Sequence, residues 1–139
     1  MANILLVDDS PDILDALTYI LKDLHGYEVR TATSAKYMMQ ELESFKPDVI
    51  LLDVLLSGED GRDICKGLKE DEQTKHIPVI LMSASDKMLK NYEEWGANDT
   101  IAKPFHLAEI TDKIKSVLKV LPALFLNLHE FSHNIMHHL

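Results

Sequence analysis

The sequence predicts an α/β fold in which helices cover both faces of a doubly wound, five-stranded parallel sheet. Short apolar runs alternate with amphipathic segments five times between residues 3 and 119. The apolar runs are continuous and rich in β-branched and aliphatic residues, which is typical of parallel strands buried on both faces. Each strand and its following helix take about 20 to 25 residues, a length that suits a right-handed crossover.

The first two units carry clear helix-boundary signals. Strands are expected over residues 3–7 and 27–32, with Ser10 capping the intervening helix and Gly26 ending it. The apolar stripe of this helix is Ile13, Leu14, Leu17, Ile20, Leu21 and Leu24. Ser34 is expected to cap the second helix. The stripe of the second helix is Ala35, Met38, Met39, Leu42 and Phe45.

Proline and glycine residues mark the limits of the later units. Asp60-Gly61 is a turn signal, Pro78 precedes a strand and Gly96 is placed to end a helix. The remaining elements are expected as strand 48–52, loop 53–61, helix 62–70, strand 79–82, helix 87–95, strand 99–102 and helix 107–119. The last helix is expected to bury Ile110, Ile114, Val117 and Leu118.

Net charge, cysteine content and the length of the apolar stretches argue against several classes of protein. The 14 Lys and Arg residues against 23 Asp and Glu residues give a net charge of −9, which argues against a nucleic-acid binder. The single cysteine, Cys65, cannot form an internal disulfide and is expected to be a buried apolar residue in a reducing cytoplasm. No apolar stretch reaches the roughly 18 residues that a membrane-spanning helix needs. These observations favour a cytoplasmic domain that binds neither nucleic acid nor membrane.

Polar residues end four of the five predicted strands. Asp8 and Asp9 follow the first strand, Asp53 the third, Ser83 the fourth and Lys103 the fifth. The carboxyl ends of parallel strands meet at one edge of the sheet, where ligands of open α/β sheets bind. Three carboxylates there would repel one another and raise one another's pKa unless a cation lay among them. A hard divalent cation with oxygen ligands, prepared for phosphoryl chemistry, is the natural partner.

Four segments together resemble the receiver domain of two-component response regulators, close to its single-domain, chemotaxis-regulator type. They are ILLVDD (4–9), DVILLD (48–53), PVILMSA (78–84) and AKPF (102–105). The resemblance implies a flavodoxin-like sheet with the strand order 2-1-3-4-5. It places a receiver domain over residues 1–120 and leaves residues 121–139 as a C-terminal helical extension. A receiver domain is a signalling switch and not an enzyme.

The resemblance also implies site roles. Asp53 would accept a phosphoryl group from a phosphohistidine on a histidine kinase or phosphotransfer protein. Ser83 would bond one phosphoryl oxygen and Lys103 would pair with another, with a cis bond between Lys103 and Pro104. The expected ligands of Mg²⁺ are the carboxylates of Asp8, Asp9 and Asp53 and the main-chain carbonyl of Leu55. With no output domain in this sequence, the signal would pass to a downstream effector protein by direct contact.

The sequence departs from the family pattern at two places. Thr100 stands three residues before Lys103, where the family usually carries Tyr or Phe as a switch residue, and a threonine has no ring to reorient. Leu56-Ser57 replaces the familiar Met-Pro pair after the acceptor. The first departure keeps an alternative open, namely a phosphorylation-independent protein-interaction module on the same fold.

Residues 121–139 lie beyond the resemblance. Their apolar stripe is Leu121, Leu124, Phe125, Leu128, Phe131 (or Ser132), Ile135 and Leu139, which favours a docking helix or a homodimer. His129, Glu130 and His133 also match the zinc-hydrolase pattern H-E-x-x-H, with His137 as a further ligand in the same row. A five-residue pattern arises by chance, so a zinc hydrolase is the second alternative, and a solvated polar face is the preferred interpretation.

Overall fold

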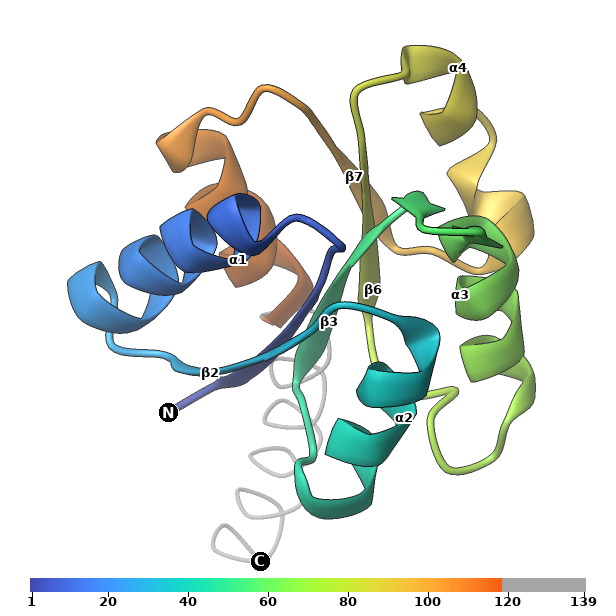
Figure 1. Cartoon of the computed structure of the whole chain (residues 1–139), viewed down its shortest axis with the longest axis horizontal. Coiled ribbons are helices and arrows are strands. Elements are labelled where there is room, and N and C mark those ends of the chain that lie inside the picture. The colour runs from blue at the N-terminus through green and yellow to red at the C-terminus, as the bar shows by residue number, and fades with distance from the viewer. Residues whose placement is uncertain (119–139) are drawn as a thin grey trace, which may run out of the picture.

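The computed structural model describes residues 1–118 and has a five-stranded parallel sheet at its centre (Figure 1). The strand order is β2-β1-β3-β6-β7, which is the predicted order 2-1-3-4-5 once a short separate hairpin is set aside. The sheet strands are β1 (Asn3–Val7), β2 (Glu28–Ala32), β3 (Val49–Asp53), β6 (Val79–Ser83) and β7 (Asp99–Ala102). The predicted fold class is confirmed, and each strand begins and ends within one residue of its predicted limits.

Helices lie on both faces of the sheet (Figure 1). One face is covered by α1 (Pro11–Thr18), its π-helical continuation η1 (Tyr19–Leu24) and the last described helix, residues 107–118. The other face is covered by α2 (Ala35–Ser44) and α3 (Gly61–Glu70). The protein is therefore a three-layer α/β/α structure, as continuous apolar strands require.

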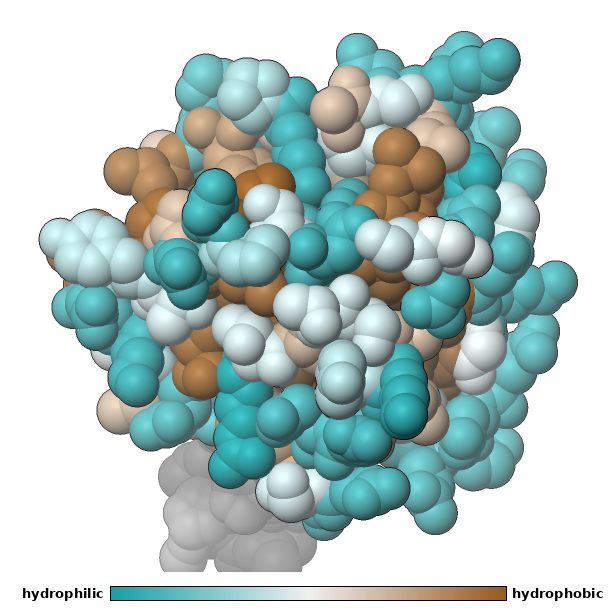
Figure 2. All heavy atoms as spheres, viewed as in Figure 1, coloured by the Kyte–Doolittle hydropathy of each residue, from teal (hydrophilic) through white to brown (hydrophobic). Residues whose placement is uncertain are grey.

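Alternate residues of the central strands supply two separate cores. Leu5, Val7, Ile50 and Leu52 pack with α2 and α3, whereas Ile4, Leu6, Val49 and Leu51 pack with α1 and the helix at 107–118. All eight side chains are fully buried. Figure 2 shows that hydrophilic side chains cover most of the face turned to the viewer, and that apolar residues reach it in separate patches. The apolar residues of β1 and β3 thus attach a helical layer to each face of the sheet, and the carboxyl ends of these two strands are held between the layers.

The helix-boundary signals act as predicted. The Ser10 hydroxyl accepts a hydrogen bond from the Ile13 N–H at 3.4 Å, and the Ser34 hydroxyl accepts one from the Tyr37 N–H at 3.2 Å. Gly26 follows the first helical segment with a φ of 75°, a conformation that glycine adopts without strain. Cys65 is fully buried, and burial raises the pKa of its thiol to about 11, so its predicted apolar role is confirmed.

Two predicted stripe residues are exposed. Leu24 is 55% exposed because the wide π-turn of η1 offsets the residue spacing, so Leu21 is buried while Leu24 faces solvent. Met39 is 48% exposed because α2 faces the core through Met38. Both predictions were wrong, since a stripe read from sequence spacing assumes an ideal α-helix with one wide apolar face.

The predicted fourth helix is broken into two pieces. A single turn, α4 (Asp86–Leu89), is followed by Asn91 in the left-handed region with a φ of 56°, and then by the 3₁₀ segment η2 (Tyr92–Trp95). Asn is one of the few residues other than glycine that adopts this conformation readily. The break lets the buried Leu89 and the half-buried Tyr92 contact the same core. A continuous helix over 87–95 was therefore a wrong prediction.

The predicted loop over residues 53–61 contains a two-stranded antiparallel hairpin of β4 (Leu55–Leu56) and β5 (Glu59–Asp60). Gly58 takes a φ of 76° in its turn. Gly61 lies so close to β3 that a Cβ on it would stand 2.1 Å from the backbone oxygen of Asp53. Only a residue without a side chain fits there, so Gly61 sets how closely the hairpin approaches the site.

The predicted C-terminal extension, residues 121–139, lies outside the described residues, as do the proposed dimerising helix and the histidine motif within it. Within residues 1–118, none of the helices combines the length and the apolar character needed to cross a bilayer.

We predict that Gly61→Ala destabilises the protein by about 3 kcal/mol or more, because its Cβ would overlap backbone that cannot move independently of β3. Gly67→Ala is the matched control on the same helix, α3. A Cβ there meets nothing within 4 Å, and the change should stabilise the protein by about 0.5 to 1 kcal/mol. Urea denaturation of both variants measures the difference. Equal stabilities would contradict the close approach of the hairpin.

Candidate functional site

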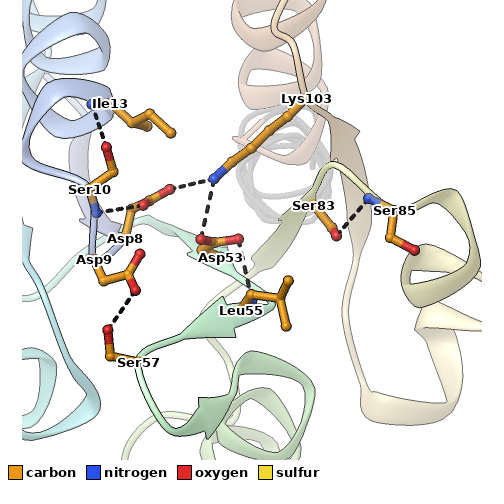
Figure 3. A network of polar contacts seen from close by, with 10 residues as sticks. All are labelled: Asp8, Asp9, Ser10, Ile13, Asp53, Leu55, Ser57, Ser83, Ser85 and Lys103. Carbon is orange, nitrogen blue, oxygen red and sulfur yellow. Dashed lines mark hydrogen bonds and ion pairs between the residues drawn. The ribbon is translucent and has the colours of Figure 1, made fainter.

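The ends of β1 and β3 bring the acidic residues together. Val7 is the register partner of Leu52 in parallel strands, so Asp8 and Asp53, the next residue of each strand, leave the sheet side by side. Both carboxylates belong to residues with almost no exposure, 0% for Asp8 and 5% for Asp53. Figure 3 shows them pointing toward the same point, with Lys103 reaching in from the opposite side.

Asp8 is held on both of its carboxylate oxygens. One oxygen, Oδ1, accepts a hydrogen bond from the Ser10 N–H at 2.9 Å. The other, Oδ2, accepts one from the Lys103 ammonium at 2.8 Å. A fully buried carboxylate is stable only when it is paired and hydrogen-bonded, and both conditions are met here.

Lys103 lies between the two buried acids. Its Nζ is 3.2 Å from Asp53 Oδ2 as well as 2.8 Å from Asp8 Oδ2. The Lys103 N–H donates to the backbone oxygen of Ser83 at 2.9 Å, which ties the lysine to the end of β6. The bond from Lys103 to Pro104 is cis, as the resemblance implied.

The pKa values of Asp53 and Lys103 are both raised, for different reasons. Burial is the main cause that raises the pKa of Asp53, and the charge of Asp8 adds to it, while Lys103 opposes both. Burial alone would lower the pKa of Lys103, but its hydrogen bond with Asp8 and the charges of both carboxylates raise it. Two buried carboxylates thus share one ammonium, and the repulsion between them adds to burial in raising the pKa of Asp53.

Asp9 joins the cluster from the loop after β1. Among the described residues, one carboxylate oxygen from each of Asp8, Asp9 and Asp53 lies within 4.8 Å of the others. The Asp9 Oδ2 accepts a hydrogen bond from the Ser57 hydroxyl at 2.8 Å. This donor set consists of hard carboxylate oxygens, which are the ligands that Mg²⁺ prefers. The residues present therefore fit a divalent cation.

Three further predicted site residues, Ser83, Leu55 and Thr100, lie at different distances from the acidic cluster along the sheet edge and the strands. Ser83 lies on the same edge with 2% exposure, and its hydroxyl accepts a hydrogen bond from the Ser85 N–H at 3.0 Å (Figure 3). Leu55 donates its N–H to Asp53 Oδ1 at 3.4 Å, while its side chain is 56% exposed. Thr100 lies within β7 opposite Leu81, so it is away from the carboxyl edge of the sheet.

Sequence reasoning missed the contact of Ser57 with the acidic cluster. Ser57 stood out only as a departure from the family pattern. The signal that could have found it is the Ser57-Gly58 pair between two apolar residues and two acids, which is typical of a tight hairpin turn.

Comparisons with known proteins give a family match over most of the described residues. The family model "Response regulator receiver domain" matches residues 4–115. The chain is 36% identical over 118 residues to the alkaline phosphatase synthesis transcriptional regulatory protein PhoP of Bacillus subtilis, covering 84% of this chain and 48% of that protein. It is 31% identical over 121 residues to the DNA-binding dual master transcriptional regulator RpaA of Synechocystis, covering 86% and 50%. The chain therefore spans about half the length of these curated relatives.

Solved structures show the same likeness. A putative response regulator from Chloroflexus aurantiacus has a TM-score of 0.78 at 34% identity, covering 84% of this chain and 97% of that one. The chemotaxis protein CheY4 of Vibrio cholerae has a TM-score of 0.77 at 28% identity, covering 84% and 98%.

We predict that Lys103→Met lowers the free energy of unfolding by about 3 kcal/mol at pH 7 without divalent cations, because two buried carboxylates lose their counter-charge. The pKa of Lys103 is raised by folding, so its pairing contributes fully below its unfolded pKa of about 10.4 and is lost above its folded pKa.

The loss of unfolding free energy in Lys103→Met should become smaller as the pH falls, because protonated carboxyls need no counter-charge. Since the pKa of Asp53 is raised, this decrease should begin above pH 3.8, the ordinary pKa of an Asp carboxyl. Urea denaturation between pH 4 and pH 8 measures it, with the exposed Lys115→Met as control. A deficit below about 1 kcal/mol at pH 7, or one that grows toward acid, would contradict a central role for the ammonium.

Proposed function

This chain belongs to the response regulator receiver domain family, and we propose that it is a signalling switch with Asp53 as its phosphoacceptor. The observation that carries the proposal is the Lys103 ammonium, 3.2 Å from the Asp53 carboxylate and 2.8 Å from that of Asp8. An ammonium group beside the buried carboxylate is placed to stabilise the negative charge of an incoming phosphoryl group.

The chemistry needs a carboxylate to attack a phosphoryl group that repels it. In the transfer, the bond between phosphorus and the imidazole nitrogen of a phosphohistidine breaks, a bond from phosphorus to an Asp53 oxygen forms, and the imidazole takes up a proton. Lys103 offsets the charge of the transferred group, and positioning with charge stabilisation is most of what phosphoryl transfer requires. The Ser83 hydroxyl, at the same edge, would donate to a phosphoryl oxygen.

We assign the divalent cation to the cluster of Asp8, Asp9 and Asp53, with the main-chain carbonyl of Leu55 as a further ligand. When bound, Mg²⁺ would neutralise charge on the phosphoryl oxygens. Asp8 is already rigid because of its two hydrogen bonds, and Asp53 is oriented by Lys103 and by the Leu55 N–H. The cation would also relieve the repulsion from Asp8, which adds to burial in raising the pKa of Asp53.

We propose a histidine kinase or a phosphotransfer protein as phosphodonor and a downstream effector protein as the recipient of the signal. Curated relatives such as RpaA are called DNA-binding, but the matched region is about half of their length, and the net charge of −9 of this chain favours protein contacts. The free, buried Cys65 supports a cytoplasmic location. A homodimer through residues 121–139 stays a prediction, as does the division into a receiver domain over residues 1–120 and an extension.

We predict that acetyl phosphate with Mg²⁺ adds one phosphoryl group per chain, detected by intact-mass spectrometry, and that Asp53→Asn abolishes it. Chelation of the metal should slow labelling on the order of 100-fold, since a main source of charge stabilisation is removed. Asp63→Asn, which removes an exposed acid from the first turn of α3, is the matched control and should label normally. Labelling that persists in Asp53→Asn would refute the assignment of the acceptor.

A second function, a phosphorylation-independent interaction module, is favoured by the surroundings of Thr100. This half-buried residue has no ring, and its backbone oxygen accepts a hydrogen bond from Lys113, whose ammonium also lies 3.6 Å from the Asp99 carboxylate in β7. These contacts tie β7 to the helix at 107–118 and would resist a rearrangement there.

If the chain is a phosphorylation-dependent switch, beryllofluoride with Mg²⁺ will change the fluorescence emission of Trp95, the only tryptophan. It will also change the association state of the full chain. The dimer dissociation constant should change at least about fivefold, the lower end of typical coupling between sites. Fluorescence and sedimentation velocity provide the measurements, with Asp53→Asn as control. Binding of the analogue without either response would favour the interaction module.

A further inference from the structure

Ser57 contacts the acidic cluster from the turn of the β4–β5 hairpin. Its hydroxyl donates a hydrogen bond of 2.8 Å to Asp9 Oδ2, across 48 residues of sequence (Figure 3). The bond joins the loop after β1 to the loop after β3, which are the two segments that supply the carboxylates.

The hairpin that carries Ser57 is fixed on several sides. The Gly61 N–H donates to the backbone oxygen of Val54 at 2.7 Å, which closes the base of the hairpin. Glu59 accepts a hydrogen bond from the Ala35 N–H at 3.3 Å, which ties the hairpin to the start of α2. The Ser57 hydroxyl is therefore presented to the cluster from an anchored turn.

Asp9 depends on this contact more than the other two acids do. Asp8 accepts hydrogen bonds from Ser10 and Lys103, and Asp53 interacts with Lys103 and the Leu55 N–H. Within residues 1–118, the Asp9 carboxylate accepts a hydrogen bond from Ser57 alone. Asp9 is also the most accessible of the three, so its side chain has the most freedom to lose when it binds a cation.

We propose that Ser57 is a positioning residue that holds the Asp9 carboxylate in the cluster and thereby tightens the binding of a divalent cation. The proposal rests on the proposed function, because it concerns the same cation site. A carboxylate has two oxygens with about four acceptor positions, so one hydrogen bond from Ser57 leaves room for a cation. Groups that orient metal ligands in this way contribute substantially to affinity.

The Ser57 hydroxyl also has an effect that weakens cation binding, because it draws charge from the carboxylate that the cation needs. The sign of the change in affinity on removing the hydroxyl therefore distinguishes positioning from competition. Preorganisation should prevail, because one neutral hydroxyl replaces little of the carboxylate charge, whereas a free Asp9 side chain would have to be ordered on binding.

The experiment measures Mg²⁺ binding to the full chain by isothermal titration calorimetry. Ser57→Ala should weaken the affinity about three- to tenfold, below the 10- to 100-fold range of buried orienting groups, because this contact is exposed. Ser57→Thr, which keeps a hydroxyl, should restore most of the affinity. Ser116→Ala, an exposed serine on the helix at 107–118, should leave it unchanged.

A double-variant cycle separates positioning from a general effect on the fold. In an Asp9→Asn background, Ser57→Ala should cause no further loss of affinity, and the unfolding midpoint of Ser57→Ala in EDTA should match that of the unaltered protein. Equal or tighter binding by Ser57→Ala would overturn the role of Ser57 alone. Failure of the unaltered protein to bind Mg²⁺ would overturn the proposed cation site as well.

Discussion

Two buried carboxylates, Asp8 and Asp53, share a single ammonium group, and the other features of the site follow from that arrangement. The parallel register of β1 and β3 makes the close approach of the acids unavoidable, and the fifth sheet strand delivers Lys103 to the space between them. One positive charge does not balance two negative ones, and Asp9 adds a third. The resulting excess of negative charge is what makes a cation and a phosphoryl group chemically complementary partners of this edge.

The hairpin after β3 connects the site to the rest of the molecule. Gly61 lets it lie against the backbone of Asp53, and Asp60 caps α3 while pairing with Arg62 at 2.8 Å. The Arg62 guanidinium in turn lies 5.3 Å from the centre of the Trp95 ring in η2. Contacts therefore run without interruption from the backbone of Asp53 to the broken fourth helix, and they do not include Thr100 in β7.

The main elements and most of the site could be predicted because they depend on local pattern. The apolar runs ending in Asp8, Asp53 and Lys103 identify strands and their carboxyl ends without any knowledge of packing. Ser10 and Ser34 cap helices through hydrogen bonds to residues only three positions away. The errors arose where backbone geometry departs from the ideal helix, as at Leu24 after the π-turn and at Asn91 in the left-handed region.

The residue pattern and the family resemblance were enough to predict the fold class, the strand order, and the set of acids and lysine at one edge of the sheet. Three contacts became visible only in the folded chain: those of Lys103 with both Asp8 and Asp53, the close approach of Gly61 to the backbone of Asp53, and the hydrogen bond from Ser57 to Asp9. The difference lies in the sequence separation over which each interaction acts. Hydrophobic periodicity and capping act over a few residues, whereas these contacts depend on how loops far apart in the sequence approach once the two cores are packed.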